Sequence, residues 1–113
     1  MQTMAMNKIN WRVENNQTLG EITLGENFLV KIFVVPEVHF GVACSYYFSF
    51  ISVYHKGEIL FESGLKNRYH FYFASLDEIN EKRIGDILHF CILEKEWEHK
   101  NKLTSLEELD NLI

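Results

Sequence analysis

The stretch Val42–Gly64 constrains the fold most, because it combines a dense run of aromatic and β-branched residues with a tight turn. Side chains on a β-strand alternate between two faces. One face of the first arm carries Cys44, Tyr46, Phe48, Phe50 and Tyr54. Gly57 can adopt positive φ, which predicts a turn over residues 55–58 with His55 exposed to solvent. We therefore predict the central hairpin of an antiparallel sheet, with its aromatic face packed on a helix.

Further strands are predicted on both sides of this hairpin from short alternating or continuously apolar runs. They cover residues 7–13, 19–24, 28–35 and 69–73, and the return arm of the hairpin covers 59–62. Pro36 lacks an N–H group and is predicted either to end the third strand or to mark an edge of the sheet. Residues 36–41 then form the longest loop of the sheet region, either a plain connection or a binding loop.

Two helices are predicted after the sheet. Ser75–Glu78 has the pattern of a capping box, and apolar residues then recur at helical spacing to about Glu94, with Lys100 as the furthest end. A second capping box predicts a short helix over 106–113. The predicted fold is α+β in a single domain, 1–113. An antiparallel sheet of about five to six strands (1–74) precedes one longer helix packed on a sheet face and a short C-terminal helix.

The net charge of −5 lies entirely in the helical part of the chain. Residues 1–74 hold six acidic and six basic residues, whereas residues 75–113 hold ten acidic and five basic ones. This distribution argues against direct binding to nucleic acids or anionic membranes, because both attract Lys and Arg. An acidic face suits a basic protein partner. The alternative is a solvated face that keeps the protein soluble.

No residue pattern predicts a catalytic or metal site. The five histidines form no HxH, HxxxH or HExxH pattern and there is no Cys-x-x-Cys, so no metal or other cofactor is expected. Cys44 and Cys91 fall on a predicted strand and a predicted helix. They are expected to be buried thiols, and a bridge between them has no support in the sequence. No enzymatic activity is expected.

The first ten residues lack the apolar segment of a secretory signal, and the sequence holds no uninterrupted apolar run of membrane-spanning length. The expected location is therefore the cytoplasm.

The lead hypothesis is a non-enzymatic acidic binding protein that inhibits or neutralises a basic protein partner, such as a nuclease toxin or a nucleic-acid-handling enzyme. The residues expected to contact it are Glu94, Glu96, Trp97, Glu98, Glu107, Glu108, Asp110, Glu37, His39 and Phe40. In size, acidity and lack of motifs the chain resembles small immunity-type inhibitors and phage or bacterial accessory proteins. One alternative is a small ligand-binding or hydrolytic domain with an apolar pocket between sheet and helix. Another is a self-associating structural module, so both a monomer and a homodimer stay open.

Overall fold

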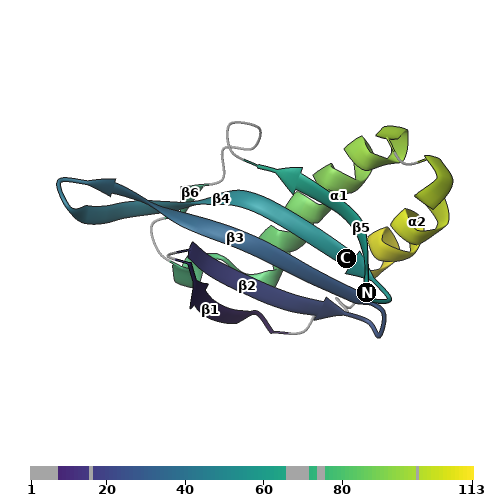
Figure 1. Ribbon diagram of the computed structural model, residues 1–113, viewed down its shortest axis with the longest axis horizontal. Helices are drawn as coiled ribbons and strands as arrows, with labels where there is room; N and C mark the ends of the chain where they lie inside the picture. The colour runs from purple at the N-terminus through teal and green to yellow at the C-terminus, as the bar shows by residue number, and fades with distance from the viewer. Residues whose placement is uncertain (1–7, 16, 66–71, 74–75, 99) are drawn as a thin grey trace.

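The computed structural model shows an antiparallel β-sheet with two helices packed on one of its faces (Figure 1). It describes residues 8–15, 17–65, 72–73, 76–98 and 100–113. The elements are β1 (Asn10–Glu14), β2 (Gln17–Leu24), β3 (Phe28–His39), β4 (Val42–His55), β5 (Glu58–Gly64), β6 (Tyr72–Phe73), the 3-10 turn η1 (Leu76–Glu78), α1 (Glu81–Glu98), the 3-10 turn η2 (Lys100–Lys102) and α2 (Leu103–Leu112). The predicted α+β fold, an antiparallel sheet followed by a longer and a shorter helix, is confirmed.

The strands lie side by side in the order β1-β2-β3-β4-β5, and the short β6 also pairs with β4. The strand order follows the chain order, because a tight turn places each strand beside the one before it. His55 pairs with Glu58, which leaves Lys56 and Gly57 as the two turn residues, at φ 52° and 84°. Two positive φ values define a type I′ turn, whose twist matches that of antiparallel strands. The turn predicted at 55–58 is confirmed.

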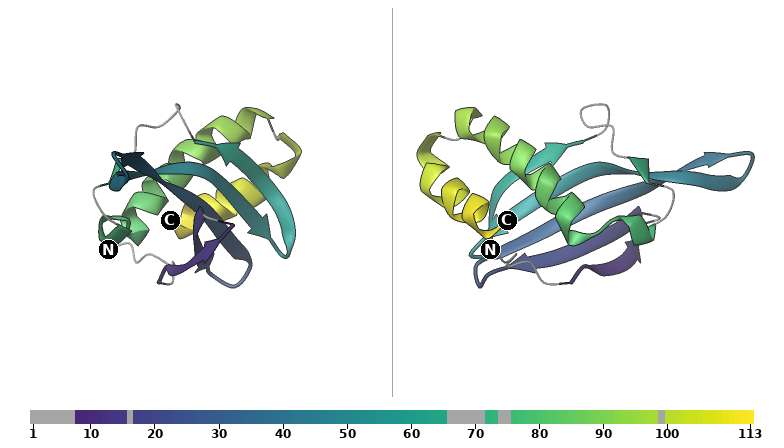
Figure 2. Two further views of the ribbon diagram at one scale, coloured as in Figure 1. Left: turned by 60° about the vertical axis from the view of Figure 1, so that its left-hand side comes forward. Right: turned by 180° about the vertical axis from the view of Figure 1, so that it is seen from behind.

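The β3–β4 hairpin is longer than predicted, because Pro36 does not end β3. Pairing with β4 continues until His39 lies opposite Val42, so the prediction of a loop over 36–41 is wrong. β2 pairs with β3 only as far as Val34. Beyond that point one edge of β3 has no partner among the described strands, and an edge tolerates the missing N–H of proline. The end of the hairpin therefore projects beyond the rest of the sheet (Figures 1 and 2).

A β-bulge in β4 divides its aromatic side chains between the two faces of the sheet. The pairing with β3 skips Ser49, and one extra residue reverses the alternation that follows it. Phe48 belongs to the core below the helices, and Tyr46 packs against that core. Phe50 and Tyr54 lie on the opposite face, which carries no helix. The prediction that the aromatic face packs against the helix is therefore confirmed for Tyr46 and Phe48. It is wrong for Phe50 and Tyr54.

The core fills the space between the sheet and the two helices. α1 crosses the sheet diagonally, and α2 returns beside the C-terminal half of α1 (Figure 2). The helices contribute Ile84, Ile87, Leu88, Cys91, Ile92, Leu106 and Leu109, none more than 1% exposed. The burial predicted for Cys91 is confirmed, whereas the side chain of Cys44 lies outside the described residues.

α1 begins at Glu81 rather than in the predicted capping box. Asn80 Oδ1 accepts a hydrogen bond from the Arg83 N–H at 3.0 Å, which makes Asn80 the N-cap. Ile79 is buried in the core, and α1 begins only after this residue. Ser75, the predicted cap, lies outside the described residues.

α2 begins at Leu103, three residues before the predicted start, and its N-cap Lys102 makes no side-chain capping hydrogen bond. The second capping-box prediction is therefore wrong. Lys102 Nζ instead donates to the carbonyl oxygens of Ile59 and Leu60 on β5, at 3.5 and 3.3 Å. This long-range contact ties the start of α2 to β5, and the local sequence does not reveal it.

Candidate functional site

The residues predicted to contact a partner lie at opposite ends of the molecule, whose longest extent is 47 Å (Figures 1 and 2). Glu37, His39 and Phe40 belong to the projecting end of the β3–β4 hairpin, although the side chains of Glu37 and His39 lie outside the described residues. The predicted acidic residues and Trp97 belong to α1 and α2. The structure therefore divides the predicted surface into a hairpin end and a helical end.

Several acidic residues of the helical end are paired within the protein. Lys95 Nζ donates to Glu98 Oε2 at 2.8 Å, and the Lys95 side chain is largely buried. Asp110 Oδ1 lies 2.8 Å from His89 Nδ1, which links α2 to α1. These contacts stabilise the helical end and reduce the charge that it offers to a partner. Acidic residues of α1 and α2 without such a contact in the described part of the chain include Asp86, Glu96 and Glu107.

His55 is not the exposed turn residue that the sequence predicts. It pairs with Phe28, and the two rings stack with centroids 4.5 Å apart on the face that α2 covers. Its Nε2 lies 3.5 Å from Glu108 Oε2, but no described residue gives that nitrogen a hydrogen bond of good geometry. The Glu108 carboxylate therefore lies near the imidazole without a hydrogen bond to it. The approach of α2 covers most of the His55 side chain, which is 17% exposed, and the sequence of the turn does not encode that approach.

The outer face of α1 carries a row of three large apolar side chains, which we call the outer stripe: Phe90, Leu93 and Trp97. Their side chains are 51%, 52% and 80% exposed. The spacing of i, i+3 and i+7 places them on one side of the helix, opposite the buried side. The exposed Asp86 precedes Phe90 by one turn, and the half-buried Glu94 lies beside the stripe.

The sequence reasoning found Trp97 and Glu94 but missed Phe90 and Leu93. The signal was present as a second set of apolar residues at helical spacing, offset from the set that forms the core. A helix that is apolar on two sides is typical of one that is buried on both. Here only the side facing the sheet is buried by described residues, so the outer stripe is a candidate interface.

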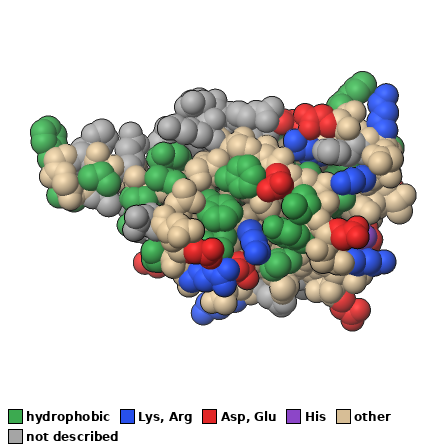
Figure 3. Space-filling view, in the orientation of Figure 1, with side chains coloured by type: hydrophobic (Ala, Val, Ile, Leu, Met, Phe, Trp, Pro, Cys, Tyr) green, Lys and Arg blue, Asp and Glu red, His purple; other side chains and the backbone are tan. Residues whose placement is uncertain are grey.

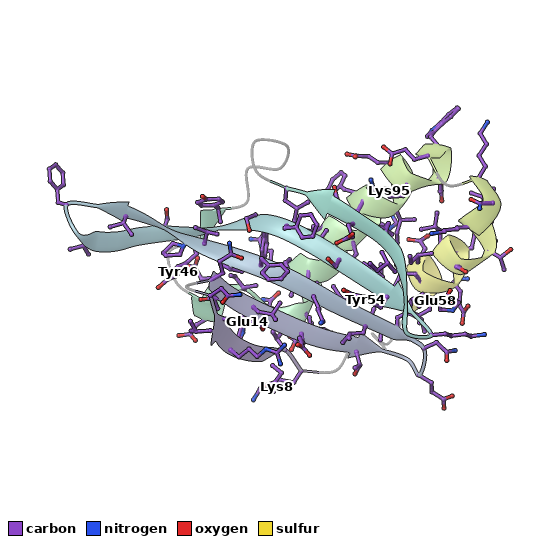
Figure 4. The ribbon with its side chains drawn as sticks, viewed as in Figure 1. Lys8, Glu14, Tyr46, Tyr54, Glu58 and Lys95 are labelled. Carbon is purple, nitrogen blue, oxygen red and sulfur yellow. The ribbon has the colours of Figure 1, made fainter. Side chains whose placement is uncertain are left out.

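A shallow groove of about 470 Å³ lies on the face of the sheet without helices. Phe33 and Phe50, whose ring centroids are 6.1 Å apart, line it together with Tyr54. Hydrophobic side chains gather over the middle of this face (Figure 3), and Glu14 and Tyr54 lie toward the two ends of the groove (Figure 4). The groove could accommodate an aromatic or peptide ligand.

The charged groups of this groove already have partners. The Arg12 guanidinium bridges to Glu21 at 2.6 Å and Glu14 at 3.3 Å. Lys31 Nζ lies 5.3 Å from the centre of the Tyr54 ring, a cation–π contact. A ligand would have to displace these contacts to gain a charge pair, which weakens the groove as a site for an ionic ligand.

Two features of the structure bear on the alternative hypotheses. In the predicted ligand pocket between sheet and helix, Ile22, Ile51 and Leu88 are at most 1% exposed and belong to one packed cluster. Self-association through a strand edge is opposed at β5, where Lys102 covers two carbonyl groups. It is opposed at the hairpin by Pro36, because lysine and proline are common guards of strand edges.

Among the described residues, no group of three or more His, Cys, Asp or Glu side chains is arranged to hold a metal ion. Within the same residues, neither helix combines the length and the apolar character that crossing a bilayer requires. Comparison with known proteins finds no matching family model, no matching curated protein and no matching solved structure.

Proposed function

We propose that this chain is a non-enzymatic binding protein that inhibits or neutralises a basic protein partner, which docks on the outer face of α1. The observation that carries the proposal is the outer stripe, where Phe90, Leu93 and Trp97 form a row of exposed large apolar side chains. Contiguous exposed apolar surface is typical of interaction sites. A nuclease toxin or a nucleic-acid-handling enzyme is the kind of partner that the acidic charge favours.

The composition of this face matches that of a protein–protein interface. Such interfaces have an apolar centre rich in aromatic residues and a polar rim, and tryptophan is among the commonest hot-spot residues. Trp97 and its two neighbours supply the centre, while Asp86 and Glu94 supply acidic groups at the rim. The excess of five acidic residues in 75–113 attracts a basic partner over long range and speeds association.

The test compares variants of the full chain against a partner captured from the native host, identified and purified. Trp97→Ala is expected to weaken binding by about 30-fold, since truncating a hot-spot residue costs about 2 kcal/mol. The free energy of unfolding should change by less than about 0.5 kcal/mol, because the side chain is mostly exposed in the isolated protein. Isothermal titration calorimetry and urea unfolding measure the two quantities.

Val13→Ser is the matched control, because Val13 is a similarly exposed apolar residue that lies on β1, away from α1. Its affinity for the partner should match that of the unmodified chain. Asp86→Lys should slow association and reduce the salt dependence of the association rate. An acidic partner, or a basic partner whose affinity survives Trp97→Ala and Leu93→Ser together, would show that the proposal is wrong.

A further inference from the structure

The tip of the β3–β4 hairpin combines a strained backbone with a fully exposed aromatic side chain. Phe40 and Gly41 are the two turn residues, at φ 54° and 78°, between the paired residues His39 and Val42. Glycine adopts positive φ without cost, whereas a bulky L-residue in this region is an outlier that costs stability. Phe40 nevertheless occupies the position, with its side chain 104% exposed.

The turn between β4 and β5 provides an internal comparison. Lys56 and Gly57 adopt nearly the same pair of φ values, 52° and 84°, between their own paired residues. The first turn position there is a charged residue that belongs in water. Turn geometry therefore does not require an aromatic residue, and neither does packing, because the exposed side chain of Phe40 contributes no buried area.

The strands on either side of the tip extend this apolar surface. Val38 and Val42 are 54% and 64% exposed, and hydrophobic side chains occupy the far end of the hairpin in Figure 3. The pairing opposite Glu37 and Val38 skips Cys44 of β4, and this β-bulge twists the arm where it leaves the sheet. Strain and exposed apolar surface at one point of a fold both favour a binding role.

We infer that Phe40 is the anchor of an insertion arm that fills an apolar pocket of a protein partner. This contact lies at the opposite end of the molecule from the outer stripe, so it does not depend on the function proposed for α1. A hairpin with an aromatic tip enters a concave site without rearranging the sheet, and an aromatic side chain has only two rotatable bonds, so it loses little entropy on binding.

The lack of positive charge on the arm favours a pocket of a protein over a phosphate-bearing surface as its binding site. Residues 32–55 contain no Lys or Arg, and the arm carries one acidic residue, Glu37. Nucleic acids and anionic lipids are bound through Lys and Arg, which this segment lacks. Pro36 has no N–H to donate, which disfavours edge-to-edge strand pairing of this arm with a second copy of the chain.

The first experiment places benzoylphenylalanine, a photoreactive aromatic residue, at position 40 of the full chain in the native host. A second chain carries it at position 56, the equivalent turn position between β4 and β5. A discrete protein that cross-links at position 40 and not at position 56 is expected, and mass spectrometry identifies it. Cross-linking of the chain to itself, cross-linking to lipid, equal labelling at both positions or no cross-linked protein would each overturn the inference.

The second experiment measures binding of the identified partner, purified, to the full chain and to Phe40→Asn. Asparagine tolerates positive φ better than phenylalanine, so Phe40→Asn should keep or raise the midpoint of thermal unfolding. Binding should nevertheless weaken by about tenfold or more, the effect of losing one buried aromatic side chain. Opposite changes in stability and affinity are the signature of an anchor, and a folding defect does not produce them.

Lys56→Asn is the matched control and should leave affinity within about twofold. Unchanged affinity of Phe40→Asn would overturn the inference, as would an equal loss in the control. Vesicles of phosphatidylcholine, with and without phosphatidylserine, and sedimentation of the full chain alone test the other occupants. Binding to either vesicle, or dimerisation that Phe40→Asn abolishes, would assign the tip to a membrane or to a second copy instead.

Discussion

Replacing Gly20 on β2 with alanine tests how β1 is held on the sheet. Gly20 lies directly opposite Trp11 of β1, and the indole ring covers the glycine. A Cβ built on Gly20 lies 2.8 Å from Cζ3 of the ring and 3.1 Å from two further ring carbons. Carbon atoms in good contact are about 3.5–4.0 Å apart, so the ring would have to move by roughly 0.7–1.2 Å.

The cost follows from this displacement. Trp11 packs against the core, and overpacking of this kind costs about 1–3 kcal/mol. Without the clash, alanine in a strand is more stable than glycine by roughly 0.5–1 kcal/mol. Gly20→Ala should therefore destabilise the chain by about 1–2 kcal/mol but stabilise a chain that already carries Trp11→Ala. The expected coupling free energy between the two substitutions is about 2 kcal/mol.

Urea unfolding of the four chains of this double-mutant cycle, followed by far-ultraviolet circular dichroism, gives the coupling. The circular dichroism signal avoids dependence on Trp11 fluorescence. If Gly20→Ala costs the same free energy whether residue 11 is tryptophan or alanine, the ring does not occupy the space above Gly20. The packing argument would then be refuted.

The remaining predictions concern three substitutions at the helical end. Lys95→Met should change the free energy of unfolding by less than about 1 kcal/mol, because methionine replaces the buried aliphatic part of the lysine side chain. Glu98→Lys should lower the free energy of unfolding by about 1–2 kcal/mol, because it places a second cation beside Lys95. Urea unfolding checks both, and an equal effect of the two changes would contradict the ion-pair reasoning. Lys102→Ala should uncover the β5 edge and increase self-association in light scattering at high concentration. A monomer at every concentration would mean that Lys102 does not guard the edge.

The elements of the sheet could be predicted wherever local chemistry decides them. Gly57 predicted the β4–β5 turn, because few other residues adopt positive φ without cost. Pro36 allowed two predictions, the end of a strand or an edge of the sheet, and the structure agrees with the edge. Whether β2 reaches that far depends on strand lengths set by the whole sheet.

The candidate interfaces could be predicted only in part. Trp97 was found beside acidic residues, and Phe40 was found beside Gly41. Neither was recognised as the most exposed side chain of the surface to which it belongs, the outer stripe for Trp97 and the hairpin tip for Phe40. Phe90 and Leu93 were missed because apolar residues at helical spacing do not show which side of a helix meets the sheet. The sequence reasoning also did not find that Lys95 lies beside Glu98 and binds its carboxylate.

The sequence by itself determined the class of fold, the tight turn that closes Val42–Gly64, and the concentration of acidic charge after residue 75. Each of these depends on period, composition or backbone freedom, which are properties of short segments. Only the tertiary structure decided that Ser49 bulges, that His55 lies beneath α2, and that the hairpin tip and the outer stripe occupy opposite ends of the molecule. Contacts between distant segments set these features, and no local pattern records which segments meet.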